Sequence, residues 1–513
     1  MEWVSKHNRD PKQRRSGADR RGFLLLFFVL GLLSGCSDKS GLPDPISRDM
    51  EQIVADGTLR ALTTFSGTSY FIYRGQPMGF EYELLQRFAG HQGLNLEIVV
   101  TQHIDSLFHM LNRGDADVVA HGLAITLGRK EFVAFSDYFY LSHQVLVQRK
   151  PENWRDLKLH QIRDSLVTSP IDLIGQTVSV RKNSSYVYRL QNLSREMGGI
   201  IHIDTLSGSL ATDEIIRMVV DGEIRYTVAD NNIAHINAAY YPDLDVEVPI
   251  SFSQRMGWAV RPNSPKLLRA INSWLKDFKK TIDYHVIYDR YFENKRRFIK
   301  RNESEFYSLY NDNISPYDSL IKVHADTLGW DWRLLASLIY QESQFNPSAT
   351  SWAGARGLMQ IMPATAKELG IRAITDPFQN LEGGTTYLKQ LWQRFDNVED
   401  ITQRIKLTMA AYNCGYHHVL DAQTLADKRE LDPEQWDDHV ETVMLDLSYP
   451  KHYNDPVVQY GYVRGSEPVA YVKEIFDRYW HYVQLITPAE GLEDEKAKES
   501  GKEGGRQNDS ETQ

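Results

Sequence analysis

Hydrophobic and polar positions follow two different patterns along the chain, and the change falls near residue 316. Up to about residue 280, short apolar runs typical of strands, at 58–63, 94–100, 176–180 and 224–229, alternate with helical patterns such as 80–88. Strands that alternate with helices predict a sheet built through crossover connections. The first part of the chain is therefore expected to be an α/β module.

From residue 316 onwards the spacing of apolar residues is helical. The stretches 318–328, 332–343, 385–395 and 401–412 carry apolar residues three or four positions apart, with Gly-rich or Pro-containing breaks between them. No strand alternation is evident in this part of the sequence. The second module is expected to be mostly α.

The N-terminal segment has the pattern of an export signal. Four arginines between residues 14 and 21 precede an apolar run at 23–33, which is too short for a comfortable membrane span. The following Leu-Ser-Gly-Cys block resembles a bacterial lipoprotein box, which implies that Cys36 is lipidated and becomes the new N-terminus. Ser37 then favours the outer membrane. A plain cleaved signal peptide and an uncleaved anchor are the alternatives.

These patterns predict six segments. They are a signal peptide with lipobox at 1–36, a linker at 37–47, the α/β module at 48–295, a second linker at 296–315, the helical module at 316–487 and a tail at 488–513. The tail contains almost no apolar residues and is expected to be disordered.

Composition narrows the functional classes. Of the 513 residues, 42% are hydrophobic and 25% charged, which is typical of folded soluble modules. The net charge of -10, without a strongly basic domain, argues against a nucleic-acid partner. If Cys36 carries lipid, Cys414 has no disulfide partner and is expected to be a small buried thiol. No Cys/His spacing predicts a metal site, and no cofactor is expected.

Glu342 is the principal candidate for chemistry. It ends an apolar helical stretch, and Leu335 and Leu338 lie seven and four positions before it, on the same helix face. A carboxylate on an apolar face is costly to ionise, so its pKa should rise. A carboxylic acid still protonated near neutral pH suits the breaking of a glycosidic bond. An isolated Glu at a helix end would more often point to water or cap a backbone group.

Three blocks follow Glu342 and Ser343 in a recognisable order: Gly-Leu-Met-Gln at 357–360, Ala-Tyr-Asn at 411–413 and Tyr-Val at 471–472. Together they resemble the lytic murein transglycosylases, in particular the soluble-lytic-transglycosylase catalytic domain with its lysozyme-like helical fold. The resemblance implies an exotransglycosylase that cleaves the MurNAc-GlcNAc β-1,4 bond of peptidoglycan glycan strands without water and leaves 1,6-anhydromuramoyl ends.

The same resemblance implies roles for individual residues. Glu342 would act first as acid and then as base. The residues expected to hold the sugar or to orient the acid are Ser343, Met359, Gln360, Tyr412, Asn413 and Tyr471. The residues before Tyr471, Glu467 and Pro468, depart from the usual Glu-Thr lead-in. For Met359 taken alone, core packing is the better interpretation.

The α/β module resembles the family 3 periplasmic solute-binding proteins over about residues 50–280. The matching blocks are Gly-Phe-Glu-Tyr-Glu-Leu at 79–84, Leu-Asn-Arg-Gly-Asp-Ala-Asp at 111–117 and Thr-Leu-Gly-Arg at 126–129. The resemblance implies that Arg129 holds the α-carboxylate of a ligand and Asp230 its ammonium group. The alternatives are an ion pair of Arg129 with Glu131 and ordinary turn chemistry at Asp230.

The sequence thus predicts a wall-cutting enzyme anchored by lipid on the periplasmic face of the outer membrane. A muropeptide or amino acid would bind the first module and regulate the second. Two other functions stay open: a muropeptide or amino-acid sensor with weak or no catalysis, and a hydrolytic lysozyme with a second carboxylate.

Overall fold

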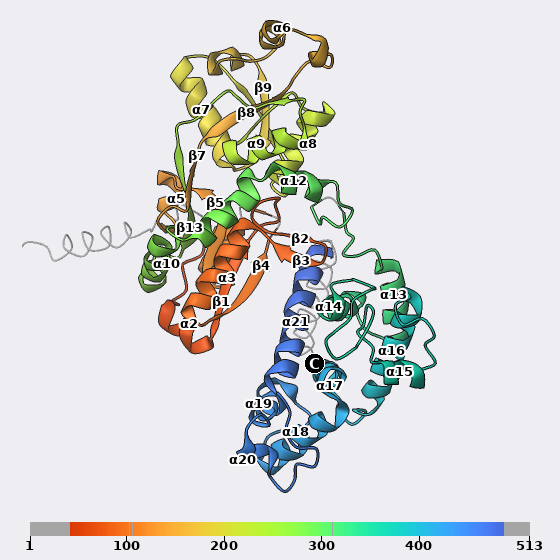
Figure 1. Ribbon diagram of the computed structural model, residues 1–513. Helices are drawn as coiled ribbons and strands as arrows, with labels where there is room; N and C mark the ends of the chain where they lie inside the picture. Colours follow the sequence, from red (N-terminus) through yellow and green to blue (C-terminus); the bar gives the residue numbers. More distant parts are fainter. Residues whose placement is uncertain (1–41, 102, 105, 310, 487–513) are drawn as a thin grey trace, which may run out of the picture. The chain divides into compact units, whose positions relative to one another are not determined.

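The computed structural model describes residues 42–486 except 102, 105 and 310. The predicted signal peptide, Cys36 and the predicted tail lie outside these residues. An α/β region is followed in the chain by a helical region that begins with helix α13 (Asp318–Leu328), as Figure 1 shows. The fold class expected from the two hydrophobic patterns is confirmed.

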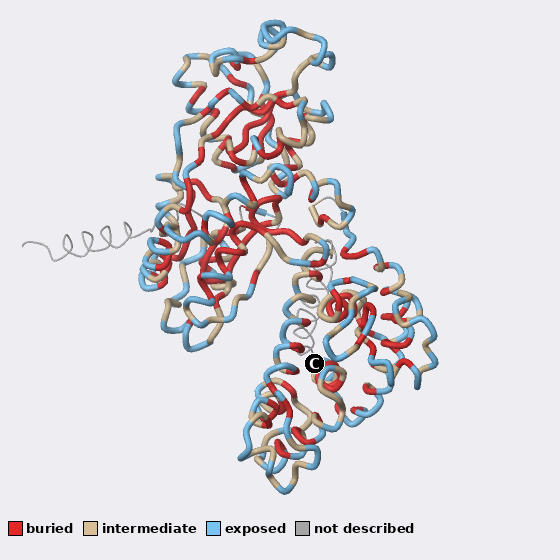
Figure 2. Tube along the Cα trace, in the orientation of Figure 1, coloured by how far each residue is buried: buried red, intermediate tan, exposed pale blue. Residues whose placement is uncertain are grey.

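The first lobe is built on a six-stranded sheet in the order β4-β1-β5-β13-β6, with β7 paired to β13. Its strands are β1 (Thr58–Thr63), β4 (Asn95–Val100), β5 (Val118–Ala124), β6 (Ala134–Phe135), β7 (Tyr140–Ser142) and β13 (Gln254–Val260). Strand β1 runs parallel to β4 and β5, with Leu62 opposite Val99, whereas β13 runs antiparallel to β5. Strands β1, β5 and β13 in the middle of this sheet are largely buried, as the red stretches in Figure 2 show.

Helices complete the first lobe. They are α2 (Met50–Asp56), α3 (Phe80–Gln92), α4 (Ser106–Arg113), α5 (Leu127–Lys130), α10 (Pro265–Phe278), α11 (Ile282–Tyr288), the π-helix η3 (Asp289–Glu293) and α12 (Lys295–Asn302). Gly93 ends α3 in the left-handed conformation, at φ 69°. The predicted linker 296–315 begins inside α12, whose Arg301 is buried and donates to the carbonyl oxygen of Gly67 at 3.0 Å.

The second lobe holds two small sheets. Strand β8 (Gln144–Arg149) pairs antiparallel with β11 (Tyr226–Asp230) and β12 (Leu244–Asp245), and β9 (Thr177–Arg181) pairs parallel with β10 (His202–Leu206). Its helices are η1 (Trp154–Asp156), α6 (Leu159–Asp164), η2 (Pro170–Leu173), α7 (Ser185–Met197), α8 (Thr212–Asp221) and α9 (Asn231–Tyr240). The chain enters this lobe after β7 and returns to the first lobe through β13.

A short hairpin projects from the first lobe. Its strands are β2 (Phe71–Tyr73) and β3 (Gln76–Met78), which pair antiparallel around a two-residue turn. Both turn residues have positive φ, 51° at Arg74 and 77° at Gly75. Two positive φ values are typical of the type I′ turn, whose twist matches that of the paired strands.

The described part of the last region consists of helices and isolated bridges, without a strand. Besides α13 these helices are α14 (Trp332–Ser343), α15 (Pro363–Glu368), α16 (Pro377–Gln393), α17 (Ile401–Cys414), α18 (Tyr416–Lys428), the π-helix η4 (Trp436–Val440), α19 (Glu441–Asp446), α20 (Pro450–Tyr453) and α21 (Ser466–Ile486). Helix α16 begins eight residues before the expected start at 385. The reason is that Asp376 caps it by accepting from the N–H of Gln379, and Pro377 takes the first helical position.

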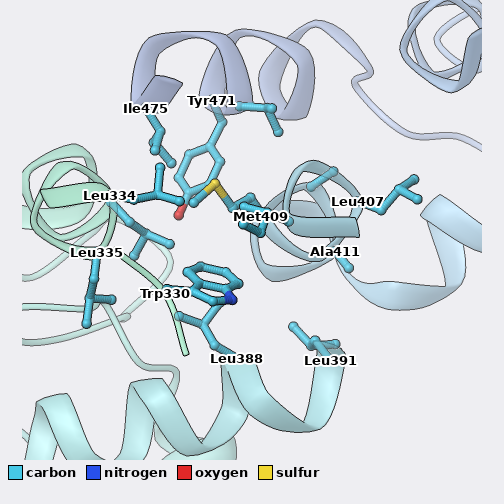
Figure 3. Close-up of a cluster of buried hydrophobic side chains, with 14 of the residues drawn as sticks. Trp330, Leu334, Leu335, Leu388, Leu391, Leu407, Met409, Ala411, Tyr471 and Ile475 are labelled. Carbon is cyan, nitrogen blue, oxygen red and sulfur yellow. The ribbon is translucent and has the colours of Figure 1, made fainter. Parts of the chain in front are cut away.

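One apolar core holds α14 in place. Side chains of α14, α16, α17 and α21 meet in it, and Figure 3 shows Leu334, Leu388, Met409 and Ile475 converging from the four helices. Tyr471 of α21 lies among these apolar groups. Burial on this scale fixes the rotation of α14 and therefore the direction of the side chains in its last turn, which include Glu342.

Candidate active site and ligand cavity

Glu342 lies in the last turn of α14. The helix is capped at its start by Asp331, whose carboxylate accepts from the N–H of Arg333 at 2.9 Å. It ends because Gln344 and Phe345 take left-handed backbone angles, φ 51° and 61°. Burial raises the pKa of Glu342 to about 7, against a smaller lowering by the hydrogen bond from Tyr471. The expected rise is confirmed, and the acid is partly protonated at neutral pH.

Two tyrosines accompany this carboxyl group. The hydroxyl of Tyr471 in α21 donates to Oε1 of Glu342. The hydroxyl of Tyr412 in α17 donates to the carbonyl oxygen of Met359 at 2.8 Å. Burial first, and then the charge of Glu342, raise the pKa of both phenols well above the ordinary value, so both stay protonated donors. Pro468 does not displace Tyr471, because it falls in the first turn of α21, where proline is tolerated.

The Gly-Leu-Met-Gln block is held against α14 and α16. The buried hydroxyl of Ser343 lies 2.8 Å from the carbonyl oxygen of Leu358 and 3.2 Å from that of Ile339. Gly357 has φ 83°, and a Cβ there would lie 2.2 Å from Nδ2 of Asn380. The buried Asn380 also accepts from the N–H of Met359 at 2.8 Å. Ser343 therefore joins the acid's helix to this block.

The side chain of Met359 lies in the core, as its residue type taken alone indicates, and not at the surface. That side chain is 0% exposed, and a Cβ on Gly384 would lie 2.3 Å from its sulfur, so it fills the core. The amide nitrogen of Gln360 donates to the carbonyl oxygens of Gly357 and Ala349, at 2.9 and 3.2 Å, which stabilises the loop. Asn413, at the end of α17, is exposed and accessible to a sugar.

A cavity lies between the two lobes of the α/β region, and both predicted ligand residues line it. Arg129 of α5 donates from Nη1 to the carbonyl oxygen of Ala124 at 3.0 Å. Asp230, at the end of β11, is buried and accepts from the hydroxyl of Tyr186 at 3.3 Å. Burial raises the pKa of Asp230 to about 6, while Tyr186 and the charges of Arg129 and Arg181 act in the opposite direction.

Comparisons with known proteins match both regions. Residues 61–294 match the bacterial extracellular solute-binding proteins, family 3, and residues 319–434 match the transglycosylase SLT domain. Membrane-bound lytic murein transglycosylase F of Desulfosudis oleivorans is 37% identical over 423 residues, which cover 82% of this chain and 89% of the relative. The chain belongs to this family. The enzyme of the same name from Pseudomonas fluorescens (strain Pf0-1) is 32% identical over 89% of each chain.

Family membership assigns the two regions their kinds of activity: the helical module is that of a lytic transglycosylase, and the α/β module is that of a solute-binding protein. The α/β region also aligns with a crystal structure of the P235GK mutant of ArgBP from T. maritima. The two are 27% identical, with a TM-score of 0.39, over 47% of this chain and 98% of that one. Relatives in the family are named membrane-bound. Within the described residues, every helix is too short or too polar to cross a membrane.

Three residues that line the cavity between the lobes were not predicted from the sequence. Arg181, at the end of β9, lines the cavity with His121 and Asp213. Burial, followed by the charges of Arg181 and Arg129, lowers the pKa of His121 to about 3, so the imidazole is neutral. These residues lie outside the blocks that carry the resemblance. The available signal was the position of Arg181 directly after a buried strand, where ligands of α/β folds often bind.

Three other residues of the helical region carry groups that could take part in chemistry. Asp376 caps α16, and Asp396 is exposed. Burial raises the pKa of the Cys414 thiol to about 12, which makes it a poor nucleophile. Within the described residues, no group of three or more His, Cys, Asp or Glu side chains is placed to hold a metal ion.

Proposed function

We propose that Glu342 is the acid and base of a lytic transglycosylase that cleaves peptidoglycan glycan strands. The observation that carries this proposal is the carboxyl group of Glu342 at the end of α14. Burial raises its pKa to about 7, and it accepts a hydrogen bond from the Tyr471 hydroxyl, which stays protonated. A general acid works best when its pKa lies near the operating pH.

The reaction needs one carboxyl group in two protonation states. Protonated Glu342 donates its proton to the oxygen that joins C1 of the muramoyl sugar to the next sugar. That bond breaks, and the N-acetyl group of the muramoyl sugar assists at C1. Ionised Glu342 then takes the proton from the C6 hydroxyl of the same sugar as its oxygen bonds to C1. Glu342 ends protonated again, and no water is consumed.

Tyr471 suits both steps. Its hydroxyl can hydrogen-bond to the carboxyl group before the first proton transfer, and it stabilises the carboxylate afterwards. Tyr412 supports the backbone beside the acid, and Asn413 offers an exposed amide for the sugar. A hydrolytic lysozyme would need a second carboxylate to activate water. The carboxylate of Asp376 instead accepts the N–H of Gln379 as a helix cap.

The proposed cellular location of the protein rests on the N-terminal sequence. We propose that Cys36 carries lipid and anchors the protein in the outer membrane, with its modules on the periplasmic face. This proposal rests on the lipobox, on Ser37 after the cysteine and on the membrane-bound names of the relatives. Two or more acyl chains are needed for stable anchoring.

We also propose that the α/β module binds a muropeptide or an amino acid and that this ligand regulates the enzyme. Arg129 would hold a free carboxylate and Asp230 an ammonium group. Arg181 provides a second guanidinium in the same cavity, which is a second group that could bind the carboxylate. The lobes already touch through Asp213 of the second lobe, which accepts from the N–H of Gly67 in the first at 3.1 Å. A ligand that binds the closed form better would shift the lobes toward it.

The activity and the regulation are tested separately. Mass spectrometry of digested peptidoglycan distinguishes anhydro ends from hydrolysed ends, because the former are lighter by one water. Hydrolysed ends alone would support a lysozyme, and no cleavage would support a sensor. Calorimetry with a muropeptide, together with turnover measured with and without it, tests the regulation.

A further inference from the structure

The turn of the β2–β3 hairpin packs against the helix that carries Glu342. The carbonyl oxygen of Gly75 accepts from the hydroxyl of Tyr482 in α21 at 2.7 Å. Ile72 of β2 is 2% exposed and belongs to the apolar core that also contains Leu335 and Leu338 of α14. A strand of the solute-binding module thus contributes to the core of the catalytic module.

Gly75 leaves no space between this turn and the catalytic module. A Cβ at Gly75 would lie 2.7 Å from Cε2 of Phe345, 2.9 Å from Cδ2 of Tyr340 and 2.9 Å from the hydroxyl oxygen of Tyr482. Real Cβ atoms essentially never come closer than 3.0 Å to another heavy atom. Two of the three neighbours are ring carbons of residues that precede and follow Glu342 within three positions.

The backbone directly after Glu342 needs support from such packing. Gln344 and Phe345 both have left-handed φ values, 51° and 61°, which residues with a Cβ adopt rarely. The N–H of Gln344 donates to the carbonyl oxygen of Tyr340 at 2.8 Å. Gln344 is exposed, so Phe345, which is 8% exposed, is the side chain of this pair that packs against the protein. The Phe345 ring packs edge-on to Tyr340, with centroids 5.7 Å apart, and is closed in by Gly75.

The hairpin itself is firmly held on its other side. The N–H of Ile72 donates to the hydroxyl of Ser308 at 2.8 Å, and the N–H of Ser308 donates back to the carbonyl oxygen of Ile72 at 3.0 Å. The N–H of Arg74 donates to the carbonyl oxygen of Phe306 at 2.9 Å. The hairpin can therefore transmit a fixed position to what packs against it.

We infer that the β2–β3 hairpin helps to position the catalytic acid: Gly75 supports Phe345, and Phe345 supports the left-handed turn that ends α14 directly after Glu342. Gly75 and Phe345 are positioning residues, since they act through Glu342. The inference rests on the proposed catalytic role of Glu342.

The test is Gly75→Ala in the full-length protein, assayed on soluble glycan strands. The added methyl group must displace Phe345 or Tyr340, and a displacement of a catalytic group of about 1 Å can cost up to about a hundredfold in rate. We expect kcat to fall roughly tenfold to a hundredfold. KM should change by less than about twofold, because an interaction made only in the transition state is lost.

A second readout is the pH profile of kcat/KM. Displacement of the turn admits water to the carboxyl group, which lowers its pKa, so the alkaline limb should move to lower pH. Tyr471 and Tyr412 face the carboxyl group from α21 and α17, and both stay protonated. Two charged side chains of α21, Arg478 and Glu474, hydrogen-bond to the side-chain amide of Gln341, the residue before Glu342.

Gly93→Ala is the matched control. Gly93 lies in the same lobe at φ 69°, close to the 77° of Gly75, but a Cβ there would have no heavy atom within 4 Å. Both variants suffer the same kind of backbone strain, and only Gly75→Ala should lower kcat. Tyr482→Phe, which removes the hydrogen bond to Gly75 and keeps the ring, should give a smaller fall in kcat, and it decides the question if Gly75→Ala does not fold.

A wild-type kcat and pH limb in Gly75→Ala, or in Tyr482→Phe if that variant decides, would overturn the inference. An equal loss in Gly93→Ala would also overturn it. Glu342→Gln separates this failure from that of the proposed function. If Glu342→Gln is inactive and Gly75→Ala is normal, only the role of the hairpin is lost; if Glu342→Gln is active, the catalytic assignment itself fails.

Discussion

Replacing Glu342 by Gln should stabilise the protein above neutral pH while it removes activity. The substitution keeps the size of the side chain and its acceptor oxygen for Tyr471 but cannot ionise. In the wild type, the pKa of Glu342 is about 7 in the fold against an ordinary value of 4.5. The folded state therefore holds this proton more tightly than the unfolded chain does, so stability falls as the pH rises from about 4.5 through 7.

The size of the effect follows from the two pKa values. At about 1.36 kcal/mol per pKa unit, the difference between 4.5 and about 7 corresponds to about 3 kcal/mol. This is an upper bound, because Glu342 is not completely enclosed. Above pH 8 the full difference should appear as a higher melting temperature of Glu342→Gln, by several degrees for a module of this size. Below about pH 4.5 the two proteins should melt together.

Differential scanning calorimetry of both proteins between pH 4 and 9 measures this difference. Glu382→Gln is a suitable control because it removes a carboxylate from an exposed position of helix α16. Equal melting temperatures of Glu342→Gln and wild type at pH 8.5 would show that the fold does not raise the pKa of Glu342. A difference that is as large at pH 4 as at pH 8.5 would also contradict the prediction, since it could not arise from ionisation.

Three further outcomes are expected. Tyr471→Phe should raise the pKa of Glu342 by about one unit or more, because a hydrogen bond to a charged group contributes about 1.5–3 kcal/mol and here favours the carboxylate. The alkaline limb of kcat/KM should then move to higher pH, and a limb that stays in place would contradict this. Arg129→Ala should abolish muropeptide binding in calorimetry and, with it, any effect of the muropeptide on turnover. Lys130→Ala, at an exposed neighbouring position in α5, should bind the muropeptide normally, and binding that survives in Arg129→Ala would exclude this site. Cys36→Ala should move the protein from the membrane fraction to the soluble fraction and abolish incorporation of a lipid label. Wild-type protein that is soluble and unlabelled would contradict the proposal that Cys36 carries lipid.

The hydrophobic pattern predicted the regular elements well because each one is a local property. The run 58–63 coincides with β1, and the stretch 332–343 coincides with α14. The start of α16 was missed because Asp376 and Pro377 lie in a Pro-containing break between the predicted stretches, although the same two residue types also begin helices.

The catalytic site was predictable as far as chemistry requires particular residue types. Glu342 and Tyr471 are brought together as the resemblance implied, and the pKa of Glu342 is raised as its place on an apolar face indicated. For Met359 the residue type taken alone indicated the core correctly, whereas a motif shows that a residue is needed without showing whether its side chain or its backbone is used. Its side chain is in the core, and its carbonyl oxygen binds Tyr412.

Contacts between distant segments could not be predicted from the pattern. Arg181 reaches the ligand cavity only because the two lobes meet there. Gly75 looks like any turn glycine in the sequence, and its contact with Tyr340 and Phe345 depends on tertiary structure across about 270 residues. Such contacts are determined by packing, for which one sequence carries no local signal.

In the proposed mechanism, the single carboxyl group of Glu342 both protonates the glycosidic oxygen and removes the proton of the C6 hydroxyl. The most direct test is mass spectrometry of purified peptidoglycan after digestion by the wild type and by Glu342→Gln, at equal protein concentration. This mechanism predicts 1,6-anhydromuramoyl ends from the wild type, and at least about a hundredfold fewer from the variant, whose fold should stay intact. Hydrolysed ends from the wild type, or anhydro ends formed by Glu342→Gln at a similar rate, would contradict it.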